Sequence, residues 1–303
     1  MTWLLSIVGA VLVGVALRDI FRTLWHPRGF GGVARSIFTA VWRLTRPLSR
    51  GERSSELSGP LALVATVAVW TAMIVLGWAL IYLPHLPEGF TYSSSLDPTS
   101  SSGLVAAIYV SFVTVTTLGY GDIVPAAWGL RLITPLQALV GFALLTAAIS
   151  WILQLYPALG RRRALARRLS ALACTDTRTV VSTGDVSVAT SLLDAITEGV
   201  IEVQVDLLQY GESYFFREER AANSLAATSG VLLDLLEAGR AASAFEVRHA
   251  AEVLAAAIDD LSTAVAKQYP HLDDGAADDP PAVLGAFARD HQQEQVRLGG
   301  GVD

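Results

Sequence analysis

The stretch Thr-Thr-Leu-Gly-Tyr-Gly-Asp at residues 116–122 lies between two long apolar segments, residues 60–83 and 130–156. Two glycines and two threonines make it flexible, polar and a poor helix former. Inside a membrane protein, non-helical backbone persists only where it is buried in protein or lines a water-filled path. Glycines at alternate positions can adopt left-handed angles and turn successive carbonyl oxygens the same way. A ring of such carbonyls can replace the hydration shell of an ion, so the stretch predicts an ion-coordinating loop.

This stretch resembles the signature sequence of potassium channels. The resemblance runs back through residues 109–115 and forward to Pro125, and with the flanking apolar segments it covers residues 60–157, about a third of the chain. A bare Gly-Tyr-Gly-Asp is more often an ordinary turn, but the preceding threonines and the apolar helix on each side favour a channel filter. The resemblance implies an all-α membrane protein, a tetrameric pore-loop channel with an outer helix at 60–83, a pore helix at 103–116, a filter at 117–122 and an inner helix at 130–156.

The resemblance also implies roles for single residues. The backbone carbonyls that would bind K⁺ belong to Thr117, Leu118, Gly119 and Tyr120, and Gly121 completes the K⁺ selectivity filter. The Thr117 hydroxyl would face the cavity, and Gly121 and Asp122 would form the outer mouth. One pore loop per chain cannot close a ring of carbonyls, so a homotetramer is implied, with the filter on its four-fold axis.

Behind the filter, the sequence departs from several channels of this family. Those channels place a glutamate there, paired with the aspartate that follows the filter, and tryptophans on the pore helix. Here the positions hold Val113, Tyr109 and Val110. Asp122 therefore lacks its carboxyl partner, and Tyr109 replaces only part of the hydrogen-bonded cuff. We expect Tyr109, Val113 and Thr116 to support the filter and ion selectivity to survive. The slow filter inactivation of those channels cannot be carried over to this chain.

The helices next to the filter carry two further signals. Ser100, Ser101 and Ser102 offer N-caps for the pore helix, whose electronegative C-terminal end would point toward a cation. Gly141 lies close to where family members carry a glycine hinge, so it is a possible gating hinge. A glycine needed only for close helix packing explains this position equally well, and both interpretations stay open.

Composition indicates a membrane protein with a soluble part. Hydrophobic residues make up 52% of the 303 residues and the mean hydropathy is +0.46, too apolar for an ordinary soluble protein. Five arginines between residues 161 and 168 follow the last apolar segment, a pattern typical of chain beside a membrane. The lone Cys174 excludes an intramolecular disulfide. Only Lys267 among 22 basic residues is lysine, which hints at a GC-rich genome and a bacterial source.

Residues 1–25 predict an extra N-terminal transmembrane helix with its N-terminus outside. A cleaved signal peptide is the rival, but the positive region that precedes the apolar run of such peptides is missing. Residues 26–59 read as a cytoplasmic linker that starts with a breaker-rich turn at 26–32 and contains an interfacial helix at 33–48. That helix would either transmit gating motion to the outer helix or only connect the two spans.

The arginine distribution predicts the topology. Six arginines lie between residues 28 and 53, and the other cluster follows Tyr156, so the positive-inside rule places both in the cytoplasm. The segment at 84–102 has no Lys or Arg and is the predicted extracellular turret. We therefore expect a multi-pass protein of the plasma membrane with a cytoplasmic C-terminus. No helix repeats arginine at every third position, which argues against a voltage sensor.

Residues 158–303 predict a helical cytoplasmic domain. Pro157 and Gly160 are expected to end the inner helix, and after a break at 175–185 apolar spacing predicts helices at 186–210, 214–238 and 243–269. Ser243 and Glu246 form a possible capping box for the last. No nucleotide-binding fingerprint is found. Asp273, Asp274, Asp278 and Asp279 lack EF-hand spacing and are read as a solvated acidic linker.

The sequence thus predicts a K⁺-selective channel through which potassium passes passively, not an enzyme. Its predicted partners are K⁺, membrane lipid and three further copies of the chain; no nucleic acid and no cofactor are expected, and any cytoplasmic partner is undefined. One alternative is a weakly selective cation channel. The other is a membrane sensor or scaffold that acts through its cytoplasmic helices while the pore is closed.

Overall fold

The computed structural model describes residues 2–25, 30–46, 57–94, 103–269 and 279–300, which contain ten α-helices and two short strands. The chain forms two compact units. Unit 1 comprises residues 1–37 and 62–153, and unit 2 comprises residues 38–61 and 154–303. Expected features at 26–29, 47–56, Ser100–Ser102, Asp273, Asp274 and Asp278 lie outside the described residues.

Unit 1 is built from apolar helices. Three helices are long and apolar enough to cross a membrane, and they are α1 (Thr2–Leu24), α3 (Ser58–Tyr82) and α5 (Trp128–Ala173). α3 has 25 residues and no charge, so at 1.5 Å per residue it is about 37 Å long, more than the hydrocarbon core of a bilayer. The shorter apolar helix α4 (Gly103–Val115) precedes the loop at 116–122. The expected all-α membrane fold is thereby confirmed.

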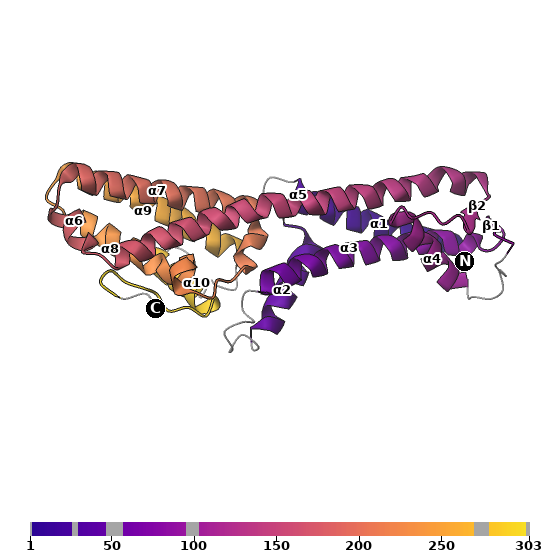
Figure 1. Ribbon diagram of the computed structural model, residues 1–303, viewed down its shortest axis with the longest axis horizontal. Helices are drawn as coiled ribbons and strands as arrows, with labels where there is room; N and C mark the ends of the chain where they lie inside the picture. The colour runs from indigo at the N-terminus through magenta and orange to yellow at the C-terminus, as the bar shows by residue number, and fades with distance from the viewer. Residues whose placement is uncertain (1, 26–29, 47–56, 95–102, 270–278, 301–303) are drawn as a thin grey trace. The chain divides into compact units, whose positions relative to one another are not determined.

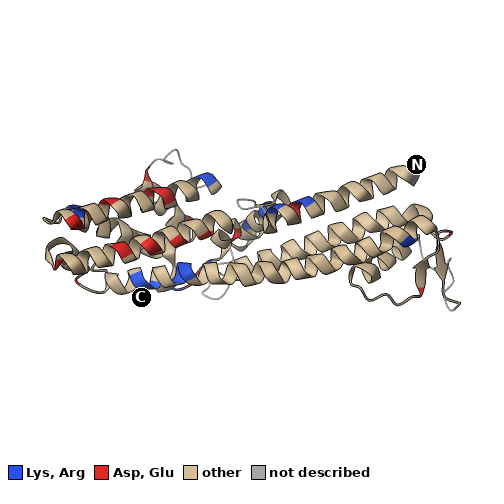
Figure 2. Ribbon diagram, turned by 90° about the horizontal axis from the view of Figure 1, so that it is seen from above, with Lys and Arg blue, Asp and Glu red and all other residues tan. Residues whose placement is uncertain are grey.

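Charged residues are unevenly distributed over the helices (Figure 2). Neither α3 nor α4 contains a charged residue, and α5 has none between Arg131 and Arg161. The long uncharged stretches of helix in Figure 2 correspond to these segments. This distribution is the one that a hydrocarbon environment requires, because a charge at the centre of a bilayer is costly.

The helix α1 packs directly on α3 through small residues. A Cβ atom added to Gly9 would lie 2.3 Å from the backbone oxygen of Gly77, and one added to Gly77 would lie 2.6 Å from the Val13 Cγ2 atom. Small residues at a crossing let two membrane helices approach closely enough to gain van der Waals contact. Both glycines are therefore required by the contact between α1 and α3.

A buried carboxylate on α1 joins three helices of unit 1. Asp19 is 5% exposed, and its oxygens accept hydrogen bonds from the backbone amides of Val33 (2.9 Å) and Ala34 (3.0 Å) and from the Trp70 indole (2.9 Å). The first two bonds cap the N-terminus of α2 (Gly32–Thr45), where a carboxylate is favoured. No local sequence signal marks Asp19, because its partners come from distant segments.

The helix α5 is longer than expected. Instead of ending at Pro157 and Gly160, it runs for 46 residues to Ala173. A proline inside a helix removes one backbone hydrogen bond, which usually favours termination. Here the residues around it, Leu155, Ala158 and Leu159, are buried, and packing of this face in unit 2 outweighs the lost bond. The prediction of a helix end at residue 156 was wrong.

Unit 2 is a helical bundle in which α7 and α9 lie side by side (Figure 1). Asp185 caps α7 by accepting from the amides of Ser187 and Val188. Asp279, predicted to belong to an acidic linker, is instead the N-cap residue of a helix that the sequence did not predict. The helices of this unit beyond α5 are α6 (Thr177–Thr183), α7 (Val186–Gln209), α8 (Leu225–Arg240), α9 (Phe245–Gln268) and α10 (Pro280–Asp290).

Two predictions about the start of helices in unit 2 were wrong. The helix expected at 214–238 begins only at Leu225, because residues 211–223 form two short 3₁₀ helices joined by extended chain, η3 (Gly211–Phe215) and η4 (Ala221–Asn223). The N-cap of α9 is Ala244, which makes no side-chain cap bond, so the capping box at Ser243 does not form.

Candidate functional site

The backbone of the loop at 116–122 alternates in handedness. Thr117, Gly119 and Gly121 have φ angles of 58°, 55° and 76°, whereas neither Leu118 nor Tyr120 has a positive φ. The two glycines thus adopt the left-handed angles expected from the sequence. A Cβ atom added to either glycine would meet no atom of the chain within 4 Å, so the backbone angle alone demands glycine there. An alternating backbone of this kind can turn successive carbonyls toward one side.

Thr117 is the unexpected member of this alternation. A β-branched residue rarely has a positive φ, and the left-handed conformation costs about 1–2 kcal/mol. Hydrogen bonds to the end of α4 hold the residue there. The Thr117 amide donates to the Thr114 oxygen (3.0 Å), and the next amide, that of Leu118, donates to the Val113 oxygen (3.1 Å). The position of α4 therefore decides whether the loop can keep this conformation.

The predicted supporting residues contact the loop in different ways. Val113 acts through its backbone oxygen, as described above. The Thr116 hydroxyl donates back to the Phe112 oxygen (2.8 Å) and so caps the end of α4. The Tyr109 hydroxyl donates to Asp122 Oδ2 (2.5 Å) and takes the place of the missing carboxyl partner.

A two-stranded sheet holds the chain after the loop. The strand β1 (Phe90–Tyr92) pairs antiparallel with β2 (Ile123–Pro125), and Thr91 lies opposite Val124. The Ser93 amide donates to the backbone oxygen of Asp122 (2.8 Å) and extends the pairing to the end of the loop. Sequence analysis predicted no strand here, since three-residue strands leave no detectable alternation in the sequence.

Gly141 lies against the end of α4. A Cβ atom added to it would lie 2.0 Å from the Val115 oxygen, far closer than two such atoms can approach. The backbone of α5 therefore touches α4 at the residue that precedes the loop. This geometry supports the packing interpretation of Gly141, and its role as a hinge stays a prediction.

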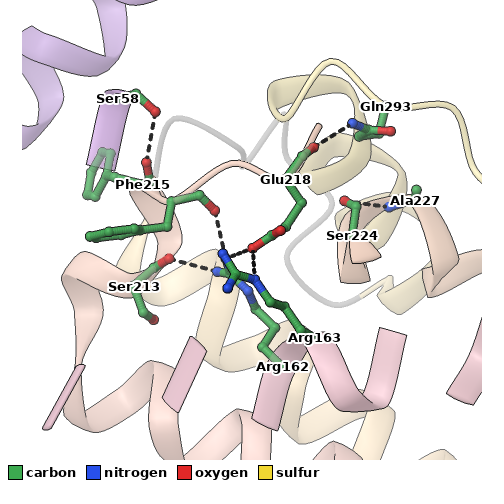
Figure 3. A network of polar contacts seen from close by, with 10 residues as sticks. Ser58, Arg162, Arg163, Ser213, Phe215, Glu218, Ser224, Ala227 and Gln293 are labelled. Atoms are coloured by element: carbon green, nitrogen blue, oxygen red, sulfur yellow. Dashed lines mark hydrogen bonds and ion pairs between the residues drawn. The ribbon is translucent and has the colours of Figure 1, made fainter. Parts of the chain in front are cut away.

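A second polar cluster lies in unit 2 (Figure 3). Arg162 is buried and donates to the backbone oxygens of Ser213 (2.7 Å) and Phe216 (2.6 Å). Its neighbour Arg163 forms an ion pair with the buried carboxylate of Glu218 at 2.6 Å, and Arg162 lies 4.0 Å from the same oxygen. Their clustering after the last apolar segment predicted a position beside a membrane surface. The structure shows instead that Arg162 and Arg163 bind protein groups.

The cluster also includes the second half of α2 and the start of α3, both in unit 2. The Arg217 guanidinium lies 3.7 Å from the centre of the Trp42 ring, and Phe38 packs on Phe215. The Ser58 hydroxyl donates to the Phe215 oxygen (3.2 Å; Figure 3). The apolar face of α2 that the sequence assigned to lipid therefore packs on protein, because Phe38 and Trp42 are buried there.

Tyr214 lies in the aromatic core of the same cluster. Burial, followed by the nearby Asp290 carboxylate, raises the pKa of Tyr214 above its usual value. Its hydroxyl therefore stays protonated and donates to Asp290 at 2.5 Å. Among the residues that the structure describes, no group of three or more His, Cys, Asp or Glu side chains could hold a metal ion.

A known protein family matches the segment that contains the loop at 116–122. Residues 68–156 match the family described as "Ion channel". The chain is 29% identical over 169 residues to the uncharacterized membrane protein YdjJ of Bacillus subtilis (strain 168), a match that covers 55% of this chain and 48% of the relative. It is 37% identical over 92 residues to two pore potassium channel c of Oryza sativa subsp. japonica, which covers 27% of this chain and 20% of that protein.

The chain therefore spans about half of the length of the first relative and a fifth of the second. No solved structure matches it significantly.

Proposed function

We propose that this membrane protein is a K⁺-selective channel in which four copies of the chain build one filter. The match of residues 68–156 to the family described as "Ion channel" supports this proposal. Potassium would pass passively down its electrochemical gradient. The carbonyls of residues 117–120 would replace the hydration shell of the ion, and Asp122 would stand at the outer mouth. The observation that carries the proposal is the alternation of left-handed angles at Thr117, Gly119 and Gly121.

Exposure within the single chain supports assembly into a tetramer. Residues Leu118 and Tyr120 are 57% and 68% exposed, although the one is apolar and the other aromatic. A cavity of about 320 Å³ beside the loop is lined by residues of α4 and α5 together with the loop itself. Around a four-fold axis, neighbouring copies would cover these side chains and close the ring of carbonyls.

We further propose a multi-pass plasma-membrane protein, of a bacterial cell as the arginine-rich composition indicates. The N-terminus would lie outside, and the segment at 26–59 and residues 158–303 would lie in the cytoplasm. The contact between Gly9 and Gly77 supports α1 as a retained transmembrane helix, because a cleaved leader has no need to fit another helix so closely. The filter mouth would then face the outside.

The reversal potential of the purified protein in a planar bilayer, with K⁺ on one side and Na⁺ on the other, tests this function. We expect a large potential of the sign that K⁺ permeation produces. A potential near zero with robust current would contradict K⁺ selectivity and identify a weakly selective cation channel. No current under any condition would favour the sensor or scaffold that acts through its helical domain.

A further inference from the structure

Three buried polar side chains lie among the apolar helices of unit 1. They are Tyr82 on α3, Ser111 on α4 and Gln137 on α5, and each is 0% exposed. A buried amide or hydroxyl without a hydrogen-bond partner costs several kcal/mol in an apolar environment. These three residues must therefore be bonded to one another or to backbone, and their geometry is fixed by those bonds.

Gln137 uses both ends of its amide to join the other two helices. Its Nε2 atom donates to the Ser111 backbone oxygen (2.9 Å) and to the Ser111 hydroxyl (2.7 Å), and its Oε1 atom accepts from the Tyr82 hydroxyl (2.7 Å). The Ser111 hydroxyl in turn donates to the Val75 oxygen of α3 (2.7 Å). One side chain of α5 thus holds α4 against α3, and an apolar side chain of the same size could not do so.

The register of the two helices extends this contact to the loop. Ser111 and Val115 are one helical turn apart on α4, and Gln137 and Gly141 are one turn apart on α5. Ser111 and Gln137 are joined by hydrogen bonds, and Val115 and Gly141 are in backbone contact, as the 2.0 Å approach of an added Cβ atom at Gly141 to the Val115 oxygen shows. The helix α5 therefore fixes α4 over its last two turns, up to the residue before Thr116.

We propose that Gln137 is a positioning residue of the filter, acting through Ser111 to hold the end of α4 where the Val113 and Thr114 oxygens bind the loop. The bonds from the Thr117 and Leu118 amides keep a strained residue in the left-handed region. Such strain persists only where the surroundings over-determine the conformation. This inference rests on the proposed K⁺ channel, because the property that Gln137 would maintain is the K⁺ selectivity of its filter.

Two variants and one control test the inference. Gln137→Met keeps the length of the side chain but loses both hydrogen-bonding groups, and Ser111→Ala removes the hydroxyl that Gln137 binds. Thr66→Val is the control, because Thr66 is equally buried and its hydroxyl bonds only the Ala62 oxygen of its own helix. Each is purified as an assembled full-length protein, and the K⁺-over-Na⁺ permeability ratio is measured from the reversal potential.

We expect about a tenfold lower permeability ratio in Gln137→Met and a clear loss in Ser111→Ala. The double variant should be no worse than Gln137→Met, and Thr66→Val should match the wild type. If Gln137→Met does not assemble, the permeability ratio of Ser111→Ala tests the inference by itself. Wild-type selectivity in the assembled variants overturns the inference and leaves the K⁺ channel intact, whereas a non-selective wild type overturns both.

Discussion

The Tyr109 hydroxyl and the Asp122 carboxylate are joined by a hydrogen bond of 2.5 Å that ties α4 to the last residue of the loop at 116–122. The backbone amide of Ile123 donates to the other carboxylate oxygen at 3.0 Å. A side chain on α4 and the strand β2 therefore hold Asp122 from two directions.

Tyr109→Phe should weaken the outer end of the filter without changing the fold. The variant loses one charge-assisted hydrogen bond, whose contribution is about 1.5–3 kcal/mol, and keeps the ring. We expect K⁺ current to decline faster during a sustained opening, while the first current after opening stays selective. The decay of macroscopic current is the measurement. An unchanged decay would mean that this bond does not limit filter stability.

Gly119→Ala should abolish K⁺ conduction. The added Cβ atom meets nothing within 4 Å, so its only effect is to oppose the φ of 55°, at about 1–2 kcal/mol in each copy of the chain. Gly129→Ala is the matched control, since that glycine is also open but has no left-handed angle, and it should conduct normally. Selective current of wild-type size through Gly119→Ala would rule out the filter assignment.

The variant Gly141→Ala distinguishes the two interpretations of Gly141, as a glycine needed for close helix packing and as a gating hinge. The methyl group would collide with the Val115 oxygen, so we expect a loss of stability of about 1–3 kcal/mol and a lower melting temperature of the assembled protein. Gly160→Ala, in the same helix with open space around it, should not lower the melting temperature, because alanine is the better helix former. A normal melting temperature with an altered open probability would instead support the hinge.

Glu218→Ala should destabilise unit 2. It leaves the buried Arg162 without a nearby carboxylate, and removing one partner of a buried pair costs about 3–5 kcal/mol, an upper bound here because the two groups are 4.0 Å apart. Glu252→Ala is the control, because Glu252 pairs with Arg240 at an exposed position. The melting temperature of the full-length protein should fall only in the first variant. Equal melting temperatures in both would show that Arg162 is held by its backbone contacts alone.

The sequence by itself determined the elements whose cause is local. Three candidate spans follow from the length and apolar composition of their segments, and α3 and α4 begin and end close to where they were expected. The left-handed angles at Gly119 and Gly121 follow from the chemistry of glycine. These features could be predicted because each depends on residues that are neighbours along the chain.

Only the tertiary structure decided the rest. The helix α5 continues through Pro157, against local propensity, because the face beyond it is buried in unit 2. Arg162 is bound by protein rather than exposed beside lipid, and Asp19 and Gln137 bind partners on other helices. Each outcome depends on which distant groups the fold brings within hydrogen-bonding distance, about 3 Å. A buried polar group is stabilised at that distance, and it costs free energy when no partner is there. Such proximity is a property of the packed chain and has no signature in the order of its residues.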